Sequence, residues 1–195
     1  MGQPASTSLA TTQYGRPRLT FNLQNMEVGF IGLGNLGLPK CKRLLAIHKQ
    51  AKVPDTATQS IINAINHGAI AANSASACVA QADILSISLP KLESVKEVMV
   101  ENFALQKLKP GAIWVDLTTN RKELVIDLAS KAPKGVIVLE APISDAVDDT
   151  RNGRLPLFVG GDTSSFDQVS PLLVNLGRVI HCDSPGSGTV IKNWD

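Results

Sequence analysis

Ten residues near the start of this chain decide its fold, and they read Val28-Gly-Phe-Ile-Gly-Leu-Gly-Asn-Leu-Gly37. The first four of them are an apolar run that predicts a short buried strand, and the residues after Gly37 have the apolar spacing of a helix. Three glycines, Gly32, Gly34 and Gly37, lie between strand and helix in the spacing Gly-x-Gly-x-x-Gly. A strand, this glycine spacing and a helix are together typical of a turn that binds a dinucleotide.

Each glycine of the turn has a separate expected task. The first permits a tight bend, the second lets the backbone approach a diphosphate, and the third lets the helix lie close to the strand. Free amide groups at the start of the helix would then bind the phosphate oxygens. We therefore expect the whole turn to bind the cofactor, through Gly32, Leu33, Gly34, Asn35, Leu36 and Gly37. The alternative is a tight strand-to-helix turn that binds no ligand.

The rest of the chain alternates short apolar runs with helical patterns, which is typical of a parallel sheet covered by helices. Strands are predicted at 27–31, 84–88, 112–116, 136–140, 157–159 and 178–181. Helices are predicted at 36–47, 58–67, 92–100, 121–131 and 164–176. The last helix opens on serine and threonine side chains that can cap its free amides. The predicted fold class is α/β, a doubly wound Rossmann-type parallel sheet.

The weakest predicted strand lies within residues 50–55, because Lys52 and Pro54 interrupt it. Proline removes a donor from a sheet, so this strand should be short or irregular. Asp55 stands about where a dinucleotide-binding domain places the acidic residue that binds the ribose. A carboxylate there accepts hydrogen bonds from the ribose hydroxyls and repels a 2′-phosphate, which slightly favours NAD over NADP. An ordinary solvated loop aspartate is the alternative.

Length, charge and cysteine content narrow the classes of function. A chain of 195 residues with 44% hydrophobic residues is long enough for one core. The net charge is only +2 and the charges are scattered, so we expect no nucleic-acid partner and no membrane surface as partner. Cys41, Cys78 and Cys182 lack metal-ligand spacing, so we predict no metal site and a reducing compartment. No apolar stretch approaches the roughly 18 residues that cross a bilayer.

Residues 1–26 differ in composition from the rest, because they are rich in serine, threonine, glutamine and asparagine and contain no acidic residue. We predict a disordered leader there, with a mitochondrial transit peptide or an N-myristoylation signal as alternatives. A cytoplasmic location is expected, and the mitochondrial matrix is the alternative. The NAD(P)-binding domain is predicted over 27–188, and the start of an interdomain helix over 189–195.

Further motifs follow the glycine turn in order. Residues 82–90 read Ala-Asp-Ile-Leu-Ser-Ile-Ser-Leu-Pro, residues 110–119 read Pro-Gly-Ala-Ile-Trp-Val-Asp-Leu-Thr-Thr, and residues 186–192 read Gly-Ser-Gly-Thr-Val-Ile-Lys. With the turn, this order resembles the β-hydroxyacid dehydrogenases, the family of 3-hydroxyisobutyrate dehydrogenase and 6-phosphogluconate dehydrogenase. The resemblance implies NAD or NADP as cofactor. It also implies a small hydroxyacid or semialdehyde, or a related carbonyl or imine, as substrate.

The resemblance also implies roles for single residues. Leu89 and Pro90 match the family's loop that lies along the cofactor. Thr118 and Thr119 match a serine/threonine pair beside the nicotinamide ribose, and we assign Thr118 to the substrate and Thr119 to the cofactor. Ser144, in the stretch Glu-Ala-Pro-Ile-Ser, matches the serine that binds the substrate carboxylate.

Lys192 matches the family's catalytic lysine, which lies one turn into a helix that opens on a glycine turn. The resemblance implies that Lys192 is a general acid/base, because an ammonium group can protonate the alkoxide that develops when a carbonyl is reduced. An ordinary solvated surface lysine is the alternative. The sequence ends at Asp195, so we expect Lys192 to lie in the final turn of its helix.

Two features leave a second function open. Asp145 and Ala146 stand where the family has two glycines, and the charge of Asp145 would repel an anionic substrate. The family continues with a C-terminal helical domain that closes the cleft and forms the dimer, and we expect this chain to lack it. Apolar surface would then be open to a homo-oligomer or a partner chain. The alternative to an oxidoreductase is a non-catalytic NAD(P)-binding module, truncated or regulatory.

Overall fold

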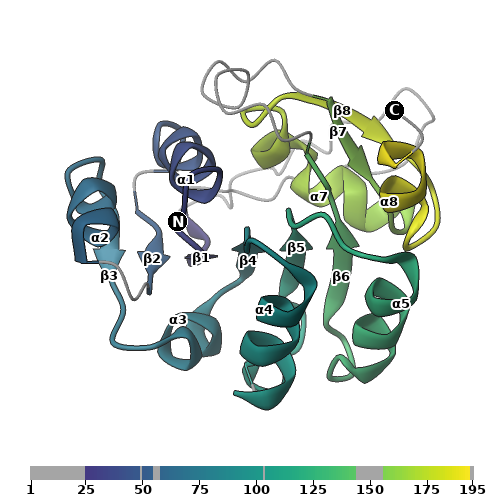
Figure 1. The fold of residues 1–195 in the computed structure, drawn as a ribbon, viewed down its shortest axis with the longest axis horizontal. Coiled ribbons are helices and arrows are strands. Elements are labelled where there is room, and N and C mark those ends of the chain that lie inside the picture. Colours follow the sequence, from purple (N-terminus) through teal and green to yellow (C-terminus); the bar gives the residue numbers. More distant parts are fainter. Residues whose placement is uncertain (1–24, 49, 55–57, 103, 144–155, 194–195) are drawn as a thin grey trace, which may run out of the picture.

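The computed structural model describes residues 25–48, 50–54, 58–102, 104–143 and 156–193. Its centre is a parallel sheet of six strands in the spatial order β3-β2-β1-β4-β5-β6 (Figure 1). These strands are β1 (Val28–Ile31), β2 (Lys52–Val53), β3 (Ile70–Ala71), β4 (Ile84–Ile87), β5 (Ile113–Asp116) and β6 (Ile137–Glu140). From β1 the chain adds β2 and β3 on one side of the sheet and then β4, β5 and β6 on the other, so the direction of strand addition reverses between β1 and β4. This topology confirms the predicted doubly wound α/β fold.

Helices cover both faces of the sheet (Figure 1). One face carries α1 (Gly37–Leu45), α2 (Thr58–Ile65) and α7 (Thr163–Leu173). The other face carries α3 (Ala75–Gln81), α4 (Leu92–Lys96) and α5 (Lys122–Lys131). Between α4 and β5 the chain forms a π-helical turn, η2 (Glu97–Glu101), and a 3₁₀ turn, η3 (Leu105–Lys107). The sheet is therefore the middle layer of three.

Along each central strand, successive side chains point alternately to the two faces of the sheet. In β5, Ile113 and Val115 pack into the core that includes α1 and α7, whereas Trp114 packs into the core that includes α3 and α5. Every residue of β1, β4 and β5 is buried. A strand that is buried on both sides reads as a nearly continuous apolar run, which explains why these three strands were visible in the sequence.

A second sheet consists of two parallel strands, β7 (Pro156–Val159) and β8 (Arg178–His181). Antiparallel bridges between Glu140 and Gly160 and between Ile143 and Leu157 join this sheet to the end of β6. A short helix, α8 (Ser187–Lys192), follows β8 and contacts β7. These contacts place the C-terminal helix beside the carboxyl edge of the main sheet.

The sequence patterns do not predict β3 or α3. β3 has only two residues and both are exposed, so it shows no apolar alternation. α3 is rich in alanine and buries only Cys78 and Val79, so its apolar stripe is too narrow to stand out. The signal that could have revealed α3 is its cap, because the Ser74 hydroxyl accepts a hydrogen bond from the Ala77 amide at 3.1 Å.

Two predicted helices differ from the structure in detail. The expected serine and threonine cap of α7 is wrong, because the carboxylate of Asp162 accepts the hydrogen bond from the Ser165 amide at 3.0 Å. The helix predicted over 92–100 is α-helical only in α4 and continues as the wider turn η2. By contrast, β2 has only two residues, which confirms the short strand that was predicted from the proline directly after it.

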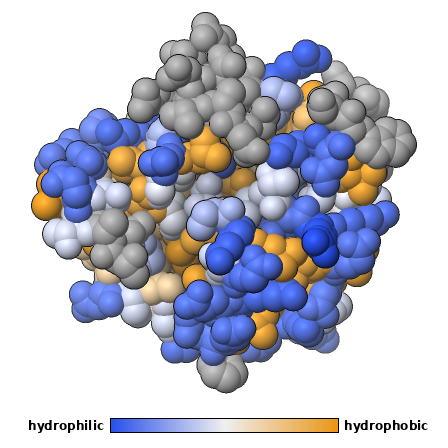
Figure 2. Space-filling view, in the orientation of Figure 1, coloured by the Kyte–Doolittle hydropathy of each residue, from blue (hydrophilic) through white to orange (hydrophobic). Residues whose placement is uncertain are grey.

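Most of the surface seen in Figure 2 is hydrophilic. Hydrophilic residues gather over α2 at the left and over α4 and α5 in the lower part of the view, and apolar residues surface in separate areas between them. Among the described residues, the large apolar side chains that are exposed are Ile47, Ile62, Ile65, Ile70, Val100, Ile126, Val174 and Ile191. Most of the remaining apolar side chains lie between the layers.

Two carboxylates are buried side by side at the carboxyl ends of β5 and β6. Asp116 and Glu140 are register partners and are 3% and 1% exposed. Asp116 accepts hydrogen bonds from the Thr118 amide at 2.9 Å and from the Asn120 side chain. Burial raises the pKa of Asp116 to about 7, with a contribution from the charge of Glu140, and burial also raises the pKa of Glu140. The fold therefore favours the protonated forms of these acids.

We expect the free energy of unfolding to fall by about 2 to 3 kcal/mol between pH 5 and pH 8 because of Asp116. The folded state holds a proton that the unfolded chain releases above its ordinary pKa of 3.8, so this stabilisation is lost as the pH rises through about 7. Asp116→Asn should flatten this part of the curve in urea unfolding. Asp127→Asn, at an exposed position of α5, is the control. An unchanged pH slope in Asp116→Asn would contradict the assignment.

Candidate functional site

The main cavity lies at the carboxyl ends of the central strands, where the strand order reverses. Its volume is about 950 Å³, which is within the range of about 300 to 1,000 Å³ that is usual for small-molecule sites. The segments after the three central strands line most of it: all six residues of the predicted glycine turn after β1, residues 88–90 after β4 and residues 117–119 after β5. Open α/β sheets bind their ligands at this position.

Two glycines of the turn permit backbone segments to touch. Gly32 has a positive φ of 96°, and a Cβ atom there would overlap the carbonyl group of Ser88. A Cβ atom on Gly37 would overlap the carbonyl group of Gly32. Any larger residue at either position would force β1, α1 and the end of β4 apart. The first and third glycines therefore hold the walls of the cavity together.

Gly34 instead faces the cavity. Apart from its chain neighbours, no described residue has an atom within 4 Å of a Cβ atom built at this position, so this part of the described structure leaves the backbone open to a ligand. The first turn of α1, which begins at Gly37, carries no acidic residue. In that turn Pro39 has no N–H and the Leu38 amide donates to the Gly34 carbonyl at 2.9 Å, so the amides that can meet a ligand lie before Leu38. No acidic side chain in the turn cancels the partial positive charge of the helix start. This combination fits a diphosphate.

Lys40 is a buried cation on α1 that lines the same cavity. Its side chain is only 3% exposed, and its ammonium group donates hydrogen bonds to Ser88 Oγ at 2.9 Å and to the Leu117 carbonyl at 3.4 Å. Lys40 thereby links α1 to the ends of β4 and β5. No motif in the sequence points to Lys40. The available signal was a lysine on the face of α1 that also buries Cys41 and Leu44.

The two threonines after β5 have different partners. Thr118 is buried, and its hydroxyl accepts a hydrogen bond from the Leu89 amide at 3.1 Å. Thr119 is half-buried, and its hydroxyl accepts a hydrogen bond from Lys192 Nζ at 2.9 Å. Thr118, Thr119, Leu89 and Pro90 all line the cavity. The structure thus brings the lysine of α8 to the edge of the cavity that these four predicted residues line.

Contacts near the start of α8 hold the helix in place. The amide and the hydroxyl of Thr189 donate hydrogen bonds to the buried carboxylate of Glu140, at 3.2 and 2.5 Å. Gly188 lies so close to β7 that a Cβ atom there would overlap the Phe158 carbonyl. Lys192 is the last residue of the helix, as expected, and its contact with Thr119 fixes the far end.

Two predicted site residues, Asp55 and Ser144, lie outside the described residues. The residues directly before them, Pro54 and Ile143, both line the cavity. Pro54 follows β2, and Ile143 follows β6 in the segment that bridges to β7. The roles of Asp55 in ribose binding and of Ser144 in substrate binding stay predictions.

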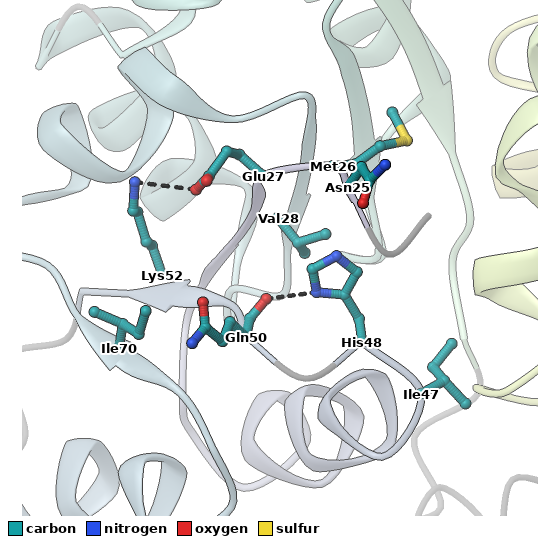
Figure 3. Close-up of a pocket in the computed structure, with 9 residues that line it drawn as sticks. All are labelled: Asn25, Met26, Glu27, Val28, Ile47, His48, Gln50, Lys52 and Ile70. Carbon is teal, nitrogen blue, oxygen red and sulfur yellow. Dashed lines mark hydrogen bonds and ion pairs between the residues drawn. The ribbon is translucent and has the colours of Figure 1, made fainter. Parts of the chain in front are cut away.

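A second cavity of about 550 Å³ lies at the opposite end of the sheet (Figure 3). The first residues of β1, β2 and β3 help to line it. Its polar groups contact one another: Lys52 forms an ion pair with Glu27 at 3.1 Å, and His48 Nδ1 lies 2.5 Å from the Gln50 carbonyl oxygen. Because this fold class binds ligands at the carboxyl ends of its strands, we assign the candidate site to the first cavity.

Other chemistries have little support in the part of the chain that the structure describes. No group of three or more histidine, cysteine or acidic side chains there is arranged to hold a metal ion. Burial raises the pKa of both Cys41 and Cys78 to about 12, so neither thiol is a ready nucleophile near neutral pH. None of the described helices has the length and apolar character needed to cross a bilayer.

Known proteins share both the sequence and the fold. A family model for the NAD binding domain of 6-phosphogluconate dehydrogenase matches residues 27–184. A 3-hydroxyisobutyrate dehydrogenase of Pseudomonas aeruginosa is 30% identical over 169 residues, which cover 85% of this chain and 57% of that protein. The structure of Mycobacterium tuberculosis 3-hydroxyisobutyrate dehydrogenase with L-serine has a TM-score of 0.79 at 29% identity, covering 86% of this chain and 57% of that one.

An imine reductase from Myxococcus stipitatus, solved with NADP+, shares the fold alone, with a TM-score of 0.77 at 19% identity. The shared region covers 86% of this chain and 59% of the reductase. The chain spans about 57% of the length of the two dehydrogenases above. The family match includes the whole main sheet and every described residue that lines the cavity. The strand order and the glycine turn agree with this match. The chain therefore belongs to the family of the NAD-binding domain of 6-phosphogluconate dehydrogenase.

Proposed function

We propose that this chain is the cofactor-binding part of an NAD(P)-dependent oxidoreductase of the β-hydroxyacid dehydrogenase type. The reaction would be hydride transfer between nicotinamide and a small hydroxyacid or semialdehyde, or a related carbonyl or imine. The observation that carries this proposal is the hydrogen bond from Lys192 Nζ to Thr119 at the edge of the cavity beside the glycine turn. Reduction of a carbonyl needs both a bound hydride donor and a positioned proton donor.

The cavity fits a nicotinamide dinucleotide in size, backbone shape and charge. Gly34 leaves open space beside its backbone, and the positive end of the α1 dipole lies there without an acidic residue in the first turn. The glycine turn would hold the diphosphate, and Leu89, Pro90 and Thr119 would line the remainder of the cofactor. When bound, the nicotinamide ring supplies or accepts the hydride.

Lys192 is the proposed general acid and base. Its Nζ lies 2.9 Å from Thr119 Oγ1, and Glu140 anchors the start of its helix through Thr189, so the ammonium group has a defined position. In the reductive direction Lys192 Nζ gives a proton to the substrate oxygen. In the oxidative direction the same atom takes the proton from the substrate hydroxyl.

Two hydroxyl groups are proposed to orient the substrate. Thr118 lines the cavity, and its hydroxyl accepts a hydrogen bond from the Leu89 amide and is also hydrogen-bonded to Asp116, which fixes its position beside the proposed substrate. Ser144 follows Ile143, which lines the cavity, and is proposed to bind the substrate carboxylate. Together with Lys192 they would surround one small polar molecule.

NAD is the proposed cofactor in preference to NADP. Among the described residues that line the cavity, Lys40 and Glu97 carry charge, and Lys40 is bonded to the ends of β4 and β5. The ribose of the adenosine half binds at the end of β2 in this fold class. Asp55 follows Pro54 there, and its carboxylate would repel a 2′-phosphate.

A non-catalytic NAD(P)-binding module is the second candidate function, and Asp145 and Ala146 favour it because they replace two glycines of the substrate motif. For either function we propose that a partner chain or a second copy covers apolar surface at the C-terminal end. Ile191 on α8 is 41% exposed, and Ile126 on the neighbouring α5 is 47% exposed. The proposed location is the cytoplasm, with the mitochondrial matrix as the alternative.

Gly34→Ala should weaken NADH binding about tenfold or more without lowering the melting temperature. The added methyl group meets no atom within 4 Å in the described residues other than its chain neighbours, and it would occupy space proposed for the diphosphate. Titration calorimetry with NADH measures the affinity, and thermal unfolding measures the stability. Gly32→Ala is the contrasting variant and should destabilise the fold, because its methyl group would overlap Ser88. Equal NADH affinity in Gly34→Ala and the parent would place the diphosphate elsewhere.

The parent protein should bind NADH about tenfold more tightly than NADPH, because Asp55 repels the extra phosphate. Asp55→Asn should bring the two affinities closer, chiefly by improving NADPH binding. Glu97→Gln, which removes a different carboxylate from the cavity lining, is the control and should keep the preference. Tighter binding of NADPH than of NADH by the parent would show the proposed cofactor choice to be wrong.

Lys192→Ala should slow single-turnover oxidation of bound NADH by semialdehydes about a hundredfold or more while leaving NADH affinity nearly unchanged. Thr119→Val removes only the hydrogen-bond partner of Lys192 and should have a smaller effect on the rate. Stopped-flow fluorescence of NADH follows the reaction. A parent protein that binds NADH and oxidises none of it with any of these substrates would support the non-catalytic module instead.

A further inference from the structure

Lys40 is a buried charge in the candidate site that the proposed reaction does not use. We propose that Lys40 makes the site distinguish the oxidation states of its cofactor, so that the reduced dinucleotide binds more tightly than the oxidised one. This inference rests on the proposed function, because it assumes that a nicotinamide dinucleotide fills the cavity. It assigns Lys40 to specificity and not to proton transfer.

The position of Lys40 determines which half of the cofactor its charge faces. The cavity runs from Pro54 and Asn73, near the ends of β2 and β3, past the glycine turn to Thr118 and Ile143. In this fold class the adenosine half lies at the end of β2 and the diphosphate at the turn. The nicotinamide half would then lie at the ends of β4 and β5. Lys40 Nζ is hydrogen-bonded to Ser88 and Leu117, which directly follow these two strands.

Two hydrogen bonds keep the ammonium group there. Ser88 Oγ lies 2.9 Å and the Leu117 carbonyl oxygen 3.4 Å from Lys40 Nζ. Ser88 and Leu117 also line the cavity, and Leu117 directly precedes the threonine pair to which Lys192 is bonded. The side chain is only 3% exposed, so water screens its charge weakly. A weakly screened charge acts strongly on any charged group beside it.

The two oxidation states differ in charge at the nicotinamide ring and nowhere else. Both carry the same negative diphosphate, which Lys40 attracts equally in either state. The oxidised ring carries one positive charge, which Lys40 repels, whereas the reduced ring is neutral. A fixed cation on the nicotinamide side therefore weakens binding of the oxidised form relative to the reduced form. This preference suits a site that works in the direction of reduction, since it favours entry of NADH and release of NAD+.

Other charged groups around the site add to this effect or reduce it. Lys192 on α8 is a second cation beside the threonine pair and acts in the same direction. Glu97 on η2 acts in the opposite direction, but it is exposed and therefore screened by solvent. Asp116 on β5 is buried behind Thr118, and burial raises its pKa to about 7, which reduces its negative charge in weakly acidic solution. Of the two cations, Lys40 is the more deeply buried and therefore the less screened by water.

The test compares the affinities of NADH, NAD+ and ADP-ribose by calorimetry in the parent, Lys40→Met and Lys42→Met. The parent should bind NADH about tenfold more tightly than NAD+. In Lys40→Met this ratio should fall to about threefold or less. NADH and ADP-ribose should lose affinity by the same factor and NAD+ by a smaller one. Lys42→Met removes a partly exposed charge from the same helix and should keep the parent's ratio.

Each outcome bears on one proposal. An unchanged ratio in Lys40→Met, or equal weakening of all three ligands, would overturn the assignment of Lys40 to redox-state specificity while leaving the proposed function intact. Failure of the parent to bind NADH would overturn the proposed function itself. Thermal unfolding checks each variant. Lys40→Gln repeats the loss of charge with a side chain that can still hydrogen-bond Ser88, and it should give the same ratio as Lys40→Met.

Discussion

The close approach of backbone segments at the glycine turn is the constraint on which the rest of this structure depends. Gly32 bends the chain directly against the carbonyl group of Ser88, and Gly37 lies directly against Gly32. Because no side chain separates these segments, the ends of β1 and β4 meet the start of α1 at one point. The cavity opens there, and Lys40, one turn further along α1, reaches the ends of β4 and β5.

The C-terminal segment depends on a different interaction, a buried carboxylate at the end of β6. Glu140 accepts two hydrogen bonds from Thr189, and Gly160 leaves room for its side chain, since a Cβ atom there would lie 2.5 Å from Glu140 Oε1. A six-residue helix is too short to be stable by itself. Glu140 and the close packing of Gly188 on β7 supply the tertiary contacts that hold it.

Charge is distributed unevenly around the cavity. Lys40 is buried and bonded to the Leu117 carbonyl, directly before the threonine pair, and Lys192 is bonded to Thr119. Burial raises the pKa of the nearby acids Asp116 and Glu140 and so biases them toward their neutral forms. Among the described residues, positive charge therefore lies at the cavity or bonded to its lining, and burial reduces the negative charge of the two nearby acids. Such a field suits a ligand with a negative diphosphate.

The fold and much of the candidate site could be predicted because their signals are local. A buried strand, three glycines at fixed spacing and a helix are adjacent in the chain, and the resemblance added Leu89, Pro90, Thr118, Thr119 and Lys192, of which all but Lys192 line the cavity. β3 and α3 escaped prediction because they bury few side chains. Only the tertiary structure decided the meeting of Lys192 with Thr119, 73 residues away, and the burial of Lys40, because burial and long-range contacts depend on how separate segments pack and leave no periodic pattern in the sequence.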